Sequence, residues 1–153
     1  MRWAAATLTI ASAVAVAVAA FLPGADPDTR DGARFPGSIL DLTPGYGTLL
    51  IVAGVLITGL AVVATVRRST PVAFVAMAAG ALVVVSVGIN NLGTGGSASV
   101  KTYSYFDLWG TGAKVALAGG LGSAVFALCL AALVRDEDSV PVKHRKETGK
   151  PLL

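Results

Sequence analysis

Side chains that could catalyse a reaction or hold a metal are few and scattered in this 153-residue chain. The chain has one cysteine, Cys129, and one histidine, His144, so these residues can form neither an internal disulfide nor a cysteine- or histidine-rich metal site. We expect Cys129 to pack inside a helical core and His144 to lie in a solvated tail. Asp26, Asp28 and Asp31 only partly match a calcium loop, because the third acid is displaced by one position and no glutamate stands at the twelfth. The sequence therefore predicts a protein without catalytic, metal or cofactor-binding residues.

A second group of polar and aromatic side chains flanks the apolar runs and is the candidate outer-loop site: Asn90, Asn91, Tyr103, Tyr105, Phe106, Asp107 and Trp109. The two asparagines are the most polar residues at membrane depth. Their amides could line a small pocket with Tyr103 or Asp107, or they could hydrogen-bond the end of their own helix. Both interpretations stay open.

Four apolar runs must position these side chains, at residues 3–22, 47–66, 71–89 and 115–134. At about 1.5 Å per helical residue, each covers roughly the 30 Å of a hydrocarbon core. The hydrophobic share of 54% and the charged share of 14% agree with a membrane protein. Because backbone groups must be satisfied within lipid, unbroken apolar runs indicate helices. We predict an all-α membrane protein with four transmembrane helices in two antiparallel hairpins, spanning residues 1–134, and a charged cytoplasmic tail at 135–153.

The first run has a competing interpretation as a cleaved secretory signal. Arg2 precedes it, and Ala17-Val18-Ala19 is similar to a cleavage site. Signal cores are shorter than this run, at about 7 to 15 apolar residues. Retention of the helix is the prediction, and cleavage would leave three spans.

Basic residues predict the orientation, since Lys and Arg near helix ends stay on the cytoplasmic side. With both termini inside, that side holds eight of them: Arg2, Arg67, Arg68, Arg135, Lys143, Arg145, Lys146 and Lys150. The other side then holds Arg30, Arg34, Lys101 and Lys114. We therefore expect a bacterial plasma-membrane protein with both termini cytoplasmic. The net charge of +3 then reflects topology and attraction of the basic tail to anionic lipid, not binding to nucleic acid.

Two segments that enter helices resemble each other, which suggests a parallel internal repeat. With a one-residue gap, the matched residues are Asp41 with Asp107, Leu42 with Leu108, Gly45 with Gly110, Gly47 with Gly112, Gly54 with Gly119, and Leu56 with Leu121. Short matches also arise by chance in glycine-rich chains, so both explanations remain. The two aspartates are expected to cap the helices that follow. Aromatic residues beside these segments, Tyr46 among them, are expected in the outer headgroup belt, with Trp3 in the inner one.

Small residues recur every four positions in three of the runs. These candidate packing or partner-interface residues are Ala11, Ala15 and Ala19 in the first run, Ala76 and Gly80 in the third, and Ala116, Gly119, Gly120, Ser123 and Ala124 in the fourth. Such spacing lets helix backbones approach closely in lipid. Because one bundle need not use every such face, the excess indicates an integral-membrane partner or a homo-oligomer.

The Ala/Val/Gly-rich spans and the Phe106-Asp107-Leu108-Trp109-Gly110-x-Gly112 helix entry make the whole chain resemble the small four-helix membrane proteins of high-GC actinobacteria. Many of those have no assigned activity, and others are accessory subunits of respiratory or cell-envelope complexes. The resemblance implies a non-catalytic accessory, scaffolding or assembly subunit of a larger membrane complex. One alternative is a homo-oligomeric transporter or channel lined by Asn90, Asn91 and Asp107. A third is an envelope sensor that uses the outer loops and the tail.

Overall fold

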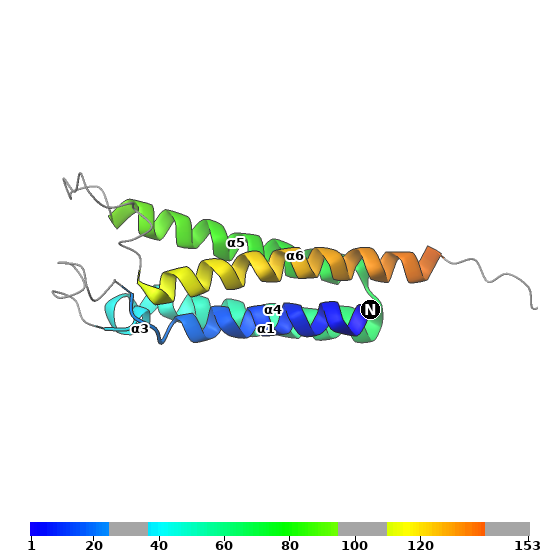
Figure 1. The fold of residues 1–153 in the computed structure, drawn as a ribbon, viewed down its shortest axis with the longest axis horizontal. Helices are drawn as coiled ribbons and strands as arrows, with labels where there is room; N and C mark the ends of the chain where they lie inside the picture. The colour runs from blue at the N-terminus through cyan, green and yellow to red at the C-terminus, as the bar shows by residue number, and fades with distance from the viewer. Residues whose placement is uncertain (25–36, 95–109, 140–153) are drawn as a thin grey trace, which may run out of the picture.

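Four long helices lie side by side in the computed structural model and run alternately in opposite directions (Figure 1). The structure describes residues 1–24, 37–94 and 110–139, with side chains at 1–24, 37–89 and 110–136. The helices are α1 (Arg2–Ala19), α3 (Ile39–Leu42), α4 (Pro44–Arg67), α5 (Thr70–Thr94) and α6 (Thr111–Ser139). All but α3 are long and apolar enough to cross a membrane. The predicted all-helical fold with four spans is confirmed.

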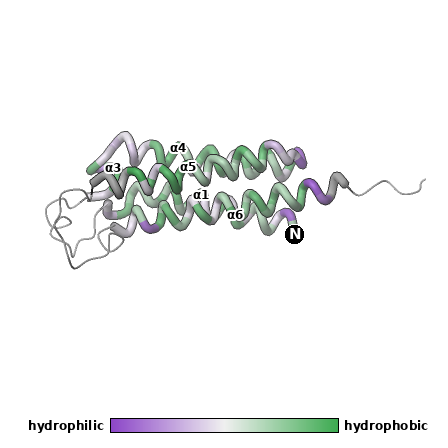
Figure 2. Tube along the Cα trace, turned by 90° about the horizontal axis from the view of Figure 1, so that it is seen from above, coloured by the Kyte–Doolittle hydropathy of each residue, from purple (hydrophilic) through white to green (hydrophobic). Residues whose placement is uncertain are grey.

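Each long helix packs against two others in a closed order around the bundle. The pairs are α1 with α4, α4 with α5, α5 with α6, and α6 with α1, whereas α4 and α6 on the diagonal barely touch. The chain thus forms two antiparallel hairpins, and α1 against α6 closes the ring. Hydrophilic residues gather toward the helix ends and hydrophobic ones along their lengths (Figure 2). We call the end with Arg2, Arg67, Arg68 and Arg135 the arginine end and the opposite one the α3 end.

The helix boundaries have local causes. Pro44 occupies the first turn of α4, where its missing N–H is not needed. Arg68 ends that helix in the left-handed conformation at φ 52° and ψ 43°, and its N–H donates to the Ala64 carbonyl. Only Arg68 and Ser69 separate α4 from α5. The interval of four residues between the apolar runs at 47–66 and 71–89 predicts such a tight turn.

The short helix α3 corrects the expectation that Asp41 caps the second span. Ser38 and Asp41 instead form a capping box at the start of α3, in which the Ser38 N–H donates to the Asp41 carboxylate. Thr43 is the N-cap of α4 and makes no side-chain capping bond. Asp41 lies one turn too early to reach α4, because α3 comes between them.

Backbone hydrogen bonds fasten α3 to the end of α1. The Ile39 N–H donates to the Leu22 carbonyl at 3.1 Å, and the Leu40 N–H to the Ala20 carbonyl at 2.9 Å. Gly47 of α4 lies so close that an added Cβ would come within 2.6 Å of the Leu40 Cα. The segment therefore folds back into the bundle rather than forming a simple entry turn.

One further expectation is corrected by the position of a single residue. Cys129 is exposed on α6, because its neighbours Ala127 and Leu130 fill the inward face. Tyr46 packs against the core cluster, and its position in the outer headgroup belt stays a prediction. The helix α6 extends past residue 134 to Ser139, since Arg, Asp and Glu in Arg135–Asp138 are tolerated in a helix after the apolar run ends.

Candidate interaction sites

Helices α5 and α6 approach most closely where the sequence places small residues. A Cβ added to Gly80 would lie 2.8 Å from the backbone nitrogen of Ala124 and 3.0 Å from the carbonyl oxygen of Gly120. The Ser123 Cβ would lie 3.1 Å from the same added Cβ on Gly80. Contact of this kind replaces the hydrophobic driving force that lipid cannot supply. These four candidate residues thus pack inside the chain.

Helix α1 is held from two sides by glycines of α4 and α6. A Cβ on Gly54 would come within 2.6 Å of the Ala13 carbonyl oxygen, and one on Gly119 within 2.8 Å of the Ser12 carbonyl oxygen. Both glycines therefore meet the middle of α1. The candidates Ala19, Ala76 and Ala116 are fully buried as well.

The internal repeat is not reproduced in this packing. If the two hairpins were equivalent, Gly54 against α1 would correspond to Gly119 against α5. Instead Gly119 meets α1, and its neighbour Gly120 meets Val83 and Val84 of α5. The part of the match from Tyr105 to Trp109 lies outside the described residues, so duplication remains a hypothesis.

The outward face of α1 carries small residues that the bundle does not cover. Ala4, Thr7 and Ala11 are exposed at spacings of three and four, and Ala15 is half-buried. Residues at this spacing share one side of a helix. Of the predicted stripe, then, Ala19 packs inward, whereas Ala11 faces the surroundings. We call Ala4, Thr7 and Ala11 the outer α1 face.

Three buried polar side chains lie in the described core: Thr9, Thr65 and Ser123. The Thr9 hydroxyl donates to the Ala5 carbonyl at 2.8 Å, and the Thr65 hydroxyl to the Ala61 carbonyl at 2.7 Å. Each bond stays within one helix and satisfies the hydroxyl. Within the described residues, the Ser123 hydroxyl is buried without a hydrogen-bond partner. The described interior is therefore mostly apolar and closely packed.

The outer-loop candidates are described only in part. Asn90 and Asn91 belong to the last turns of α5, and their side chains lie outside the described set. Tyr103, Tyr105, Phe106, Asp107 and Trp109 lie outside the described residues altogether, as do His144 and the three aspartates of the partial calcium loop. Among the residues that are described, no group of three or more His, Cys, Asp or Glu side chains could hold a metal.

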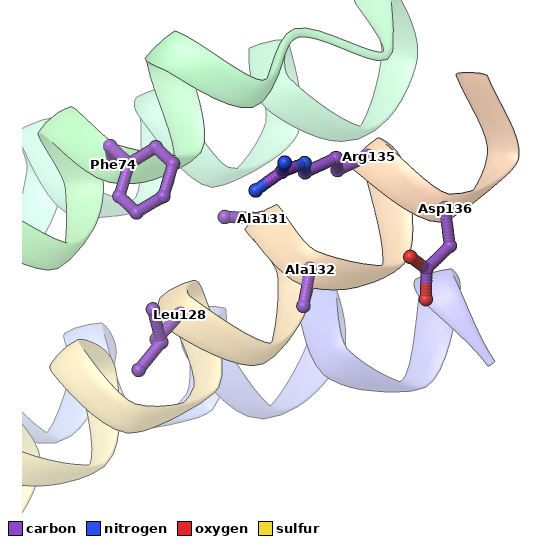
Figure 3. A pocket seen from close by; sticks show the side chains of 6 residues that line it. All are labelled: Phe74, Leu128, Ala131, Ala132, Arg135 and Asp136. Atoms are coloured by element: carbon purple, nitrogen blue, oxygen red, sulfur yellow. The ribbon is translucent and has the colours of Figure 1, made fainter. Parts of the chain in front are cut away.

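A surface groove at the arginine end was not identified from the sequence. It lies between α5 and α6, has a volume of about 530 Å³, and is lined by Phe74, Leu128, Ala131, Ala132, Arg135 and Asp136. Figure 3 shows Arg135 reaching from α6 toward Phe74, while Asp136 points away. Phe74 and Arg135 are far apart in the sequence. Only the register of α5 against α6 brings them together, and no sequence pattern fixes that register.

Comparisons with protein-family models, with curated proteins and with solved structures found no match. With four long apolar helices around a packed core, the chain is a multi-pass, all-helical membrane protein.

Proposed function

We propose that the protein is a non-catalytic accessory, scaffolding or assembly subunit of a larger complex in the bacterial plasma membrane, of the respiratory or cell-envelope kind. The observation that carries this proposal is the outer α1 face, where Ala4, Thr7 and Ala11 remain exposed after the bundle has completed its own packing. A face of small residues allows a helix of another protein to approach closely. The chain thus offers a docking surface and, in its described part, a packed apolar interior.

Some small residues pack helices together inside the chain, whereas others are exposed on its surface. Gly54, Gly80 and Gly119 all meet backbone atoms of neighbouring helices within the chain. Substituting them would disturb the fold itself. Ala11 is exposed, so enlarging it leaves the described bundle contacts intact and reports on external partners.

The test is affinity purification of the full chain from native membranes in mild detergent, followed by mass spectrometry. We expect a stoichiometric membrane-protein partner with the wild type and severalfold lower recovery of that partner with Ala11→Leu. The matched control is Ala81→Leu, the same change at an exposed position of α5, on the helix diagonal to α1. This control should retain the partner.

Two outcomes would contradict the proposal. Equal recovery with both variants would remove the outer α1 face as the docking site. Recovery of a homo-oligomer alone would favour the transporter or channel, for which flux through reconstituted liposomes and its loss on changing Asn90 or Asn91 are the next measurements.

A further inference from the structure

The groove between α5 and α6 combines apolar walls with a cationic mouth. Phe74 and Leu128 are 45% and 48% exposed and form its sides, while Ala131 at 1% exposure forms the floor. Arg135 is exposed and extends across the floor toward Phe74 (Figure 3). A groove lined this way suits an amphiphile rather than a fully polar ligand.

The groove changes from polar to apolar along its length, as one membrane leaflet does from headgroups to acyl chains. Arg135 lies at the polar end of α6, whereas Leu128 is seven residues earlier, about 10 Å deeper along the helix. Phe74 lies in the first turns of α5, which begins at Thr70. The mouth is thus level with lipid headgroups and the inner part with the first segments of the acyl chains.

The charge at this end favours an anionic headgroup. Arg68, in the turn that leads into α5, is also exposed there. An arginine guanidinium matches a phosphodiester in shape and charge, with two parallel N–H donors. Asp136 carries the opposing charge, but it is engaged within the chain and points away from Arg135 (Figure 3).

We propose that this groove binds an anionic glycerophospholipid from the adjoining leaflet. The phosphodiester accepts hydrogen bonds from the Arg135 guanidinium, and one acyl chain lies between Phe74 and Leu128 over Ala131. The volume of about 530 Å³ fits a headgroup phosphate and the upper part of one chain, within the usual size range of ligand sites. Basic pockets between transmembrane helices recognise lipid headgroups in this way. The site is separate from the outer α1 face.

Native mass spectrometry of the full chain in mild detergent, with phosphatidylglycerol titrated in, measures the apparent affinity for the first bound lipid. We expect Arg135→Gln to weaken that affinity by about tenfold, as for the loss of a charge-assisted hydrogen bond. The matched control Arg67→Gln removes an exposed arginine of the same end that does not line the groove, and should change the affinity less than about twofold.

A second variant tests the apolar part of the site. Ala132 is exposed and lines the groove, so Ala132→Phe fills the space without entering the core and should also lower affinity. Ala78→Phe, at an exposed position of α5 outside the groove, is its control.

Two competing probes identify the source of the phosphate. Phosphatidylcholine should bind more weakly than phosphatidylglycerol, and inorganic phosphate should not displace the lipid. Equal affinity of wild type and Arg135→Gln would overturn the proposal. So would displacement by inorganic phosphate, or equal binding of the two lipids.

Discussion

Ser38 and Asp41 fix the first turn of α3 through reciprocal contacts. The Ser38 hydroxyl lies 2.6 Å from an Asp41 carboxylate oxygen, and the Asp41 N–H donates back to that hydroxyl at 3.2 Å. The side-chain bond from Ser38 and the bond from its backbone N–H lower the pKa of Asp41 below the ordinary 3.8. A carboxylate that accepts two such bonds is favoured in its charged form.

This coupling predicts how the turn responds to pH. Because the folded-state pKa is lowered, the stabilisation is present above the ordinary value of 3.8 and is lost as pH falls through the lowered value. Carbon-detected NMR of the Asp41 carboxyl in detergent micelles should give a midpoint below 3.8. Ser38→Ala should raise the midpoint toward that value. A wild-type midpoint at or above 3.8 would show that the capping box does not form.

In the α1–α4 helix pair, a glycine-to-alanine substitution should affect stability differently at two glycines of α4. A Cβ added to Gly54 would lie 2.6 Å from the Ala13 carbonyl oxygen, whereas a Cβ added to Gly59 would meet nothing within 4 Å. Gly54→Ala must separate α1 from α4, and we expect a loss of about 1–3 kcal/mol of stability, as for overpacking. Gly59→Ala should be neutral or slightly stabilising, because alanine is the better helix former.

Thermal unfolding of both variants in the same detergent measures the difference. A lower apparent melting temperature for Gly54→Ala alone would agree with the close approach of α1 and α4. Equal melting temperatures would mean that the helices are farther apart than described.

The helices themselves could be predicted because lipid leaves the backbone few choices. The runs at 47–66 and 71–89 correspond to α4 and α5, which begin within three residues of the predicted starts. Apolar length and the need to satisfy every peptide group are enough to locate such elements. The turn at Arg68-Ser69 follows from the short polar interval between them.

The inward faces were harder to predict, because the helices are apolar all round. In water, polar residues mark the outside of a helix, but a span in lipid is hydrophobic on both sides. This is why Cys129 was expected inside and is exposed, and why Ala11 and Ala19 of one stripe face different surroundings. Small residues at Gly80 and Gly120 did indicate close contact. The sequence did not show whether that contact was internal, nor that Phe74 and Arg135 line one groove.

Because the described part of the molecule has an even number of spans, the N-terminus of α1 and the C-terminus of α6 lie at the same end of the bundle. Met1 and the end of α6 lie at the arginine end, with the α4–α5 turn (Figure 1). The exposed Arg67, Arg68 and Arg135 of that end favour the cytoplasmic side by the positive-inside rule. The α3 end would then face outward, carrying α3 and the start of α6.

Cysteine labelling in a Cys129→Ser background tests this orientation. Gly45→Cys places a thiol at the α3 end, at an exposed position where a Cβ meets nothing within 4 Å, and Ser69→Cys places one in the α4–α5 turn. A membrane-impermeant maleimide should label the first variant in intact cells and the second only after the cells are opened. The background without either cysteine should stay unlabelled. The reverse pattern would put the arginine end outside, and the basic residues would then be retained for contact with a partner or lipid rather than for topology.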